Sequence, residues 1–232
     1  FAENFGKEDC VVPDDGLPWQ ATRQPVILQA WPVVPPPKDG NFTTVMQWDS
    51  YKVREHNGIS YGMKSGSFEP YLELPRHTDA GLEIALGSET APRTLLVENG
   101  WLLSDPLEVT RDLHSYQQYI QRSKAEFSIA KHGYVVSHSG WFSERSANYL
   151  ASGRPVLVQE TGFSDWMNTG AGVLVFNSPE DAIAGIEQIE QNYALHCEAA
   201  QAVAEAYFDS STVLTVLLER ALHETGYQSP TY

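Results

Sequence analysis

Short apolar runs alternate with helix-like runs along most of the chain. The apolar runs are rich in β-branched and aromatic residues and are bounded by glycine, proline or polar residues, which is typical of buried strands. They predict strands at 42–48, 81–87, 134–136, 156–158 and 172–176, and we expect further extended structure at 101–110.

Runs with helical spacing lie between and after these strands. The clearest start is at Ser178, because serine is a suitable N-cap and Pro179 fits the first helical position. The apolar stripe that follows consists of Ile183, Ile186 and Ile189. Together these runs predict helices at 68–75, 91–100, 115–127, 143–152, 178–193, 194–207 and 211–224.

This alternation predicts an α/β fold, in which helices cover both faces of a mostly parallel sheet and the C-terminus is helical. In such folds ligands bind at the carboxyl ends of the strands, near helix N-termini. Three polar segments have this position, at 60–66, 85–90 and 137–143. We therefore expect a site where they meet.

The first 40 residues differ in character from the rest. A short apolar strand is expected at Val26–Leu28, and the three prolines of PPPKDG (35–40) favour a stiff polyproline II linker. Residues 1–40 are interpreted as a lead-in, either the end of a preceding domain or an edge strand laid against this one. Residues 41–232 form the predicted domain.

The charge balance narrows the classes of partner. With 15 basic and 30 acidic residues the formal net charge is −15, which argues against nucleic-acid binding and against anionic membranes. No apolar run approaches the length of a membrane span. Cys10 and Cys197 lie too far apart in the sequence to suggest a disulfide framework, so a reducing cytoplasm is the simplest location. A small molecule remains the expected partner, since one helix N-terminus suffices for one small anion.

The stretch SGWFSERS (139–146) carries the first candidate chemistry. Gly140 permits close approach of the backbone to a ligand, and Ser143 precedes a predicted helix whose free N–H groups attract anions. Arg145 either donates to such an anion or lies in solvent. Glu144 either complements the helix dipole or accepts a hydrogen bond from a hydroxyl group of a sugar or ribose.

Two further segments belong to the same predicted edge. Lys64 stands between two glycines, either as a cation folded over a phosphate or as a surface lysine in a mobile loop. Glu160 and Thr161 follow a strand, where they either accept sugar hydroxyls or are simply solvated. The seven histidines show no metal-binding spacing, so no metal site is predicted.

Residues 138–162 resemble the donor-binding, C-terminal domain of GT-B glycosyltransferases, in particular bacterial group-1 and CgeB-like members; their sequence is HSGWFSERSANYLASGRPVLVQETG. The resemblance covers about residues 42–225 and is most specific over 125–166. The matching positions are His138, Gly140, Trp141, Ser143, Gly153, Pro155, Gln159 and Glu160.

The resemblance implies a Rossmann-like domain that binds a nucleotide-sugar without a cofactor or metal. Its diphosphate would lie on the loop formed by Gly140, Trp141, Phe142 and Ser143 and on the adjacent Glu144 and Arg145. Lys64 would supply a cation, and Glu160 and Thr161 would face the donor sugar. The family's ribose-binding glutamate is replaced by Asn148, and no catalytic residue is assigned.

A GT-B enzyme has two such domains, with catalysis in the cleft between them. This chain resembles the second domain alone, so its expected partner is an N-terminal domain of the same enzyme. We expect weak or no transferase activity from this chain by itself. The alternatives are a non-catalytic nucleotide-sugar-binding module and a domain whose polar edge mediates protein contacts.

Overall fold

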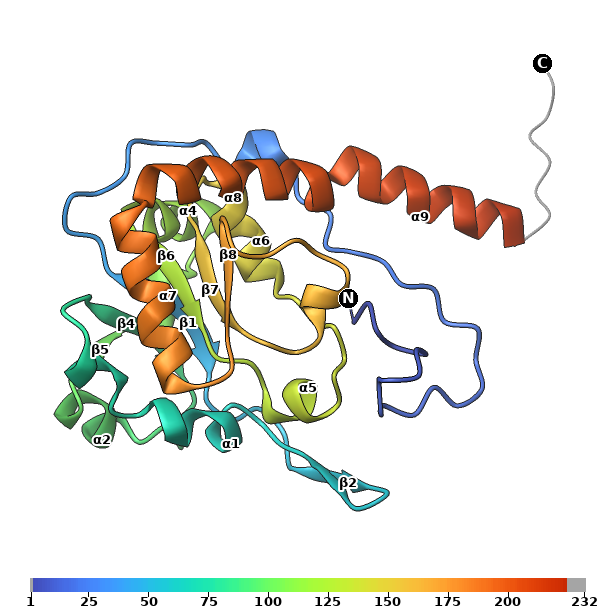
Figure 1. Ribbon diagram of the computed structural model, residues 1–232, viewed down its shortest axis with the longest axis horizontal. Coiled ribbons are helices and arrows are strands. Elements are labelled where there is room, and N and C mark those ends of the chain that lie inside the picture. Colours follow the sequence, from blue (N-terminus) through green and yellow to red (C-terminus); the bar gives the residue numbers. More distant parts are fainter. Residues whose placement is uncertain (1, 225–232) are drawn as a thin grey trace.

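The computed structural model describes residues 2–224 and contains a six-stranded, wholly parallel sheet (Figure 1). The strand order is β5-β4-β1-β6-β7-β8. The strands are β1 (Phe42–Gln47), β4 (Leu82–Gly87), β5 (Leu102–Ser104), β6 (Ala125–Ser128), β7 (Val156–Gln159) and β8 (Val173–Phe176). A separate antiparallel hairpin, β2 (Arg54–His56) and β3 (Ile59–Tyr61), extends from the domain.

Helices cover both faces of the sheet. The described helices are α1 (Ser65–Phe68), α2 (Arg93–Glu98), α3 (Pro106–Val109), α4 (Leu113–Arg122), α5 (His132–Val136), α6 (Glu144–Ala151), α7 (Pro179–Gln191), α8 (Tyr193–Phe208) and α9 (Ser210–Glu224), of which α9 extends away from the sheet (Figure 1). Short 3-10 turns lie at Leu28–Ala30, Glu69–Tyr71, Leu74–His77 and Phe163–Asp165. The predicted Rossmann-like α/β fold with a helical C-terminus is confirmed.

Alternation along the strands divides the core between the two faces. On β7, Leu157 faces a core that α2 and α7 complete. Its neighbours Val156 and Val158 face a second core formed with α6 and α8. Because successive strand residues point to opposite faces, an uninterrupted apolar strand requires such cover on both sides.

The predicted start of α7 is confirmed in detail. The Ser178 hydroxyl accepts from the Asp181 amide at 3.1 Å, and the Asp181 carboxylate accepts from the Ser178 amide at 3.1 Å. This reciprocal capping box satisfies amides that the first turn of a helix leaves free.

Three predicted elements were wrong. Residues 134–136 are not a strand but belong to α5, and Val136 is 39% exposed, so the run lacks the burial of a core strand. The helix expected at 115–127 ends at Arg122, and β6 follows, because every residue of β6 is buried in the sheet. Residues 101–110 are only partly extended, since Asp105 accepts from the Leu107 amide at 2.8 Å and starts α3.

The hairpin formed by β2 and β3 was not predicted, and one predicted helix occurs in several shorter pieces. The hairpin turn at Asn57-Gly58 has φ values of 49° and 77°, as expected of a two-residue turn between antiparallel strands. The helix expected at 68–75 is divided between the end of α1 and two 3-10 turns.

The lead-in packs along the domain. The expected strand at Val26–Leu28 is reduced to one bridge between Val26 and Asp209, followed by a 3-10 turn. The proline segment is tied to the domain by the buried Arg154, whose guanidinium donates to the carbonyl oxygens of Val34, Pro35 and Gln121 at 2.8 to 3.4 Å.

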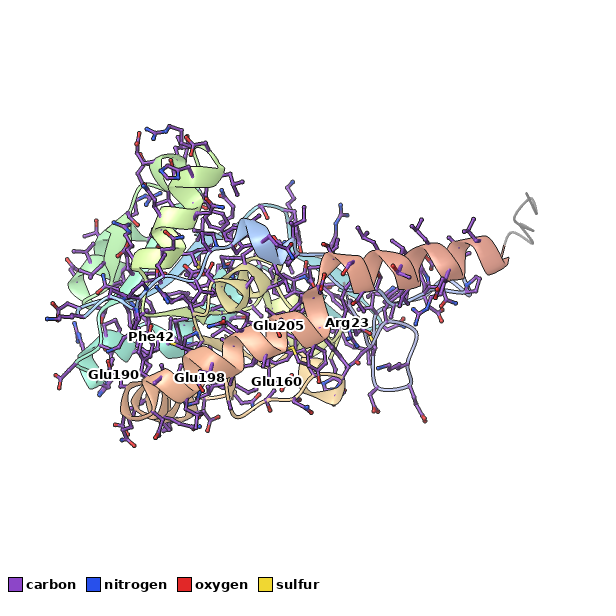
Figure 2. The ribbon with its side chains drawn as sticks, turned by 90° about the horizontal axis from the view of Figure 1, so that it is seen from above. Arg23, Phe42, Glu160, Glu190, Glu198 and Glu205 are labelled. Carbon is purple, nitrogen blue, oxygen red and sulfur yellow. The ribbon has the colours of Figure 1, made fainter. Side chains whose placement is uncertain are left out.

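The acidic surplus lies largely on the outer surface. Glu190, Glu198 and Glu205 are all exposed, on α7 and α8 (Figure 2). Within the described residues, no helix is long and apolar enough to cross a membrane.

Candidate functional site

Because the six strands are parallel, their carboxyl ends share one edge of the sheet. Two loops at this edge are joined directly: the 137–143 loop, which leads into α6, and the 160–165 loop, which follows β7. The Gly140 amide donates to the Thr161 carbonyl oxygen at 2.7 Å, and the Thr161 hydroxyl donates to the Trp141 carbonyl oxygen at 2.5 Å. The predicted positions Gly140 and Thr161 therefore meet in space.

The 137–143 loop has a sharply turned backbone. His138 and Gly140 have φ values of 49° and 69°, in the left-handed region. The turn brings Ser143 to the N-cap of α6, where its side-chain oxygen accepts from the Arg145 amide at 3.2 Å. Ser143 thus has its expected capping position at the start of a helix.

The two aromatic residues of this loop point in different directions. Phe142 is buried and stacks on Phe208 with the ring centroids 5.3 Å apart, so its side chain belongs to the core. Trp141 is partly exposed and stacks on Tyr134 at 4.7 Å. Any ligand contact of Phe142 would therefore come from its backbone.

The Arg145 side chain does not lie in solvent, which was one of the two interpretations of it, but turns into the interior. Its Nε atom donates to the fully buried Glu126 at 2.5 Å, and its terminal nitrogens donate to the Val45 carbonyl and the Ser128 hydroxyl at 2.7 Å. Burial by itself lowers the pKa of Arg145, but Glu126 outweighs that effect and raises it, so the guanidinium stays charged. These contacts use Nε and both terminal nitrogens of Arg145, and the carboxylate of Glu126 lies beside its positive charge.

Lys64 is also buried, in contrast to the mobile surface lysine considered from the sequence. Its Nζ atom donates to the Ile129 carbonyl oxygen, just beyond β6, at 2.5 Å. Burial, together with the charges of Arg145 and Lys131, holds the pKa of Lys64 well below its usual 10.5. Lys64 thus places a buried amine beneath the same sheet edge, in surroundings that disfavour its charged form.

The two carboxylates of the predicted site occupy different positions. Glu160 Oε1 accepts from the amides of Thr161 and Gly162 at 2.9 and 2.6 Å and so stabilises the 160–165 loop. Within the described chain, its other oxygen makes no hydrogen bond. Glu144 is exposed in the first turn of α6.

A small cavity of about 10 Å³ lies under the start of α6, between β6 and β7. It is bordered by Ser143, Ser146 and Gln159. The Ser146 hydroxyl is buried and has no hydrogen-bond partner among the residues that the structure describes.

Asn4, from the lead-in, was not predicted as part of the site. It is buried against Gly140, and its Nδ2 atom donates to the Gly162 carbonyl at 2.9 Å and to Asp165 at 2.8 Å. Asp165 also pairs with His138 at 2.8 Å. Asn4 and Asp165 therefore join the two loops, through contacts that no local sequence pattern indicates.

No group of three or more His, Cys, Asp or Glu side chains that could hold a metal ion occurs in the described range 2–224.

Replacing Arg145 by methionine is expected to lower the free energy of unfolding by about 3–5 kcal/mol, because it leaves Glu126 as an unpaired buried charge. Adding Glu126→Gln should recover at least half of that loss. Urea unfolding measures both, with Arg111→Met as the control for removal of an exposed arginine, expected within about 0.5 kcal/mol of wild type. A loss below about 1 kcal/mol for Arg145→Met would contradict the assigned pairing.

No protein-family model matches the sequence, and no curated protein matches it. Among solved structures, sucrose-phosphate synthase from Thermosynechococcus elongatus aligns with a TM-score of 0.60 at 12% identity, over 89% of this chain and 53% of that one. TarM aligns with a TM-score of 0.59 at 12% identity, over 94% and 44%. HepE from Anabaena, solved with UDP and glucose, aligns with a TM-score of 0.53 at 15% identity, over 87% and 56%.

The chain thus spans about half the length of the solved structures that it matches. At these identities the likeness concerns the fold. It agrees with the six-stranded parallel sheet covered by helices on both faces. The chain has the Rossmann-like fold that forms one half of a GT-B glycosyltransferase.

Proposed function

We propose that this chain is the donor-binding half of a glycosyltransferase, and that it binds a nucleoside-diphosphate sugar at the edge formed by the 137–143 and 160–165 loops. The observation that carries the proposal is the junction of these loops at the start of α6, above the buried side chains of Lys64 and Arg145. The fold supports it, because HepE, which shares this fold, has been solved with UDP-glucose.

The diphosphate is assigned to the backbone from Gly140 to Ser143 and to the first turn of α6. Helix amides that lack an internal partner point toward this position and carry partial positive charge. Lys64, whose charged form a neighbouring diphosphate would favour, is proposed to add positive potential from below, while the charge of Arg145 is balanced by Glu126. In a chain with a net charge of −15, these helix amides and the Lys64 amine are the groups proposed to favour an anionic ligand at this position.

The donor sugar is assigned to the adjacent loop. Glu160 already holds two loop amides with one oxygen, which leaves the other to accept sugar hydroxyls. The Thr161 hydroxyl donates to the Trp141 carbonyl, so its proposed role is to shape the site. Glu144, exposed at the helix start, is proposed to face a hydroxyl group, because a carboxylate beside a phosphate is unfavourable.

Transfer is proposed to need a second domain, which would provide the acceptor site. The chain covers only about half of the solved glycosyltransferases that it resembles. We expect the isolated chain to bind UDP-glucose without transferring glucose to added acceptors, as measured by release of free UDP. Release above the uncatalysed rate would contradict this division of labour. The alternative, a non-catalytic binding module, predicts the same result for the isolated chain, but it also predicts no activity after the chain is joined to an N-terminal half.

UDP binding tests the site itself. Calorimetric titration of the chain with UDP should give saturable binding, and Gly140→Ala should weaken it by about tenfold or more. The reason is that a Cβ atom at Gly140 would lie 2.8 Å from Asn4, in a backbone with φ of 69°. Gly170→Ala is the matched control, since Gly170 also has positive φ, at 99°, but its Cβ would meet open space. Absence of UDP binding, or equal effects of the two variants, would overturn the assignment.

The lowered pKa of Lys64 predicts a pH dependence. A diphosphate next to Lys64 favours the charged form of its amine. Diphosphate binding is therefore strongest at pH values below the pKa that Lys64 has in the unliganded protein, and it weakens as the pH rises through that pKa toward 10.5. UDP is fully ionised above about pH 7 and does not contribute there. In Lys64→Met this part of the pH dependence should disappear, while the exposed Lys38→Met should retain it. Parallel affinity curves for wild type and Lys64→Met would contradict the role of Lys64.

The ionisation of Lys64 also affects folding stability, which rises with pH where diphosphate binding weakens. Between the lowered pKa of Lys64 and 10.5 the unfolded chain keeps a proton that the folded chain has lost, so stability relative to Lys64→Met rises with pH in that window. Urea unfolding of the two proteins at matched pH therefore separates a loss of binding from a loss of folding.

A further inference from the structure

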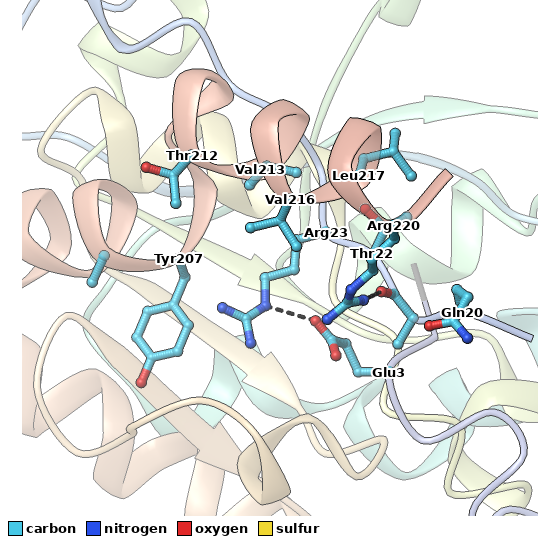
Figure 3. A pocket seen from close by; sticks show the side chains of 12 residues that line it. Glu3, Gln20, Thr22, Arg23, Tyr207, Thr212, Val213, Val216, Leu217 and Arg220 are labelled. Carbon is cyan, nitrogen blue, oxygen red and sulfur yellow. Dashed lines mark hydrogen bonds and ion pairs between the residues drawn. The ribbon is translucent and has the colours of Figure 1, made fainter. Parts of the chain in front are cut away.

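A second cavity lies away from the sheet edge, between the lead-in and the C-terminal helices (Figure 3). Its volume is about 230 Å³. Residues 20–23 and Glu3 form one side, and the end of α8 and residues 212–220 of α9 form the other. None of these residues belongs to the proposed nucleotide-sugar site.

The wall formed by α9 is apolar. Val213, Val216 and Leu217 occur at helical spacing and point into the cavity. Val216 and Leu217 remain 40% and 41% exposed, although Val213 is buried. A ligand that covered these two side chains would remove apolar surface from water, which favours binding.

The opposite wall carries charge. Arg23 pairs with Glu3 at 2.6 Å, and its guanidinium lies 5.0 Å from the ring centroid of Trp166 and 5.1 Å from that of Tyr207. These contacts fix Arg23 and neutralise it. The rings hold its planar group in one orientation.

Arg220 provides a positive charge without such compensation. It is exposed at the cavity, and one terminal nitrogen donates to the Ala21 carbonyl at 2.8 Å. Among residues 2–222, whose side chains the structure describes, no carboxylate forms an ion pair with it. Two guanidinium groups facing one carboxylate leave a surplus of one positive charge.

These features restrict the ligand. The single surplus charge in a strongly acidic chain suits one negative charge and disfavours a polyanion. The volume is below the roughly 300–1,000 Å³ of pockets for larger ligands, which disfavours a nucleotide. The apolar wall requires an apolar body next to the charge. Among small anions, a carboxylate on a short alkyl or aryl group meets all three conditions.

We propose that this cavity binds a small amphipathic monocarboxylate, with the carboxylate on Arg220 and the apolar body against Val216 and Leu217. The guanidinium of Arg220 matches a carboxylate through paired N–H donors. The site is independent of nucleotide-sugar binding, so its failure would leave the proposed function untouched.

The test is a titration of the isotope-labelled full chain with sodium hexanoate, followed by amide NMR shifts. Hexanoate should give saturable shifts confined to residues 20–23 and 206–220. Two matched probes separate the contribution of the carboxylate from that of the alkyl chain: 1-hexanol lacks the charge, and sodium acetate lacks the apolar body. Each should bind about tenfold more weakly than hexanoate.

Variants locate the two contacts. Arg220→Gln should weaken hexanoate about tenfold and leave hexanol unchanged, whereas Leu217→Asn should weaken both. Arg76→Gln is the matched control, because Arg76 is another exposed arginine that donates to a backbone carbonyl, that of Glu98. It should leave hexanoate binding unchanged.

Three outcomes would overturn the proposal. The first is scattered or non-saturating shifts with hexanoate. The second is equal effects of Arg220→Gln and Arg76→Gln. The third is a dimer in sedimentation whose dissociation is required before hexanoate shifts appear, since the α9 wall would then be covered by a second copy of the chain.

Discussion

The arrangement of the candidate site depends on one buried ion pair, that of Arg145 and Glu126. Two charges in the interior are tolerated only because they pair and because the remaining donors are used, here by Val45 and Ser128. The pair connects the first turn of α6 to β6, and the contact with Val45 reaches β1. The start of α6 is therefore held in one position over the sheet edge, which is the condition for backbone amides to act as a preorganised anion site.

Most of the sheet could be predicted from the sequence, because burial on both faces produces apolar runs and because glycine and proline mark their ends. Prediction failed where tertiary packing decides between equal local preferences. The run Tyr134–Val136 has strand-like composition but forms part of α5, and β6 was assigned to a helix. The hairpin is a different case, since the Asn57-Gly58 turn was present in the sequence as a usable local signal.

The candidate site was predictable in its backbone and much less in its side chains. Gly140 and Ser143 follow from turn and capping rules, which are local. The burial of Lys64 and Arg145 does not, because a charged residue is normally expected in solvent and its partners lie on other strands. Arg145 contacts Val45, which lies 100 positions earlier in the sequence, and Asn4 reaches Gly162 across 158 positions. Such contacts exist only once the sheet has formed.

The hydrogen bonds from Asn4 to the two loops affect how these loops move. A loop that forms hydrogen bonds only within itself can open independently of its neighbours. Here the 137–143 and 160–165 loops are hydrogen-bonded to each other, and both are hydrogen-bonded to Asn4. The amide hydrogens of Gly140 and Asn4 should therefore exchange with solvent at a common free energy of opening, as one cooperative unit. The lead-in would then set how often the proposed site opens, although it lies outside the parallel sheet.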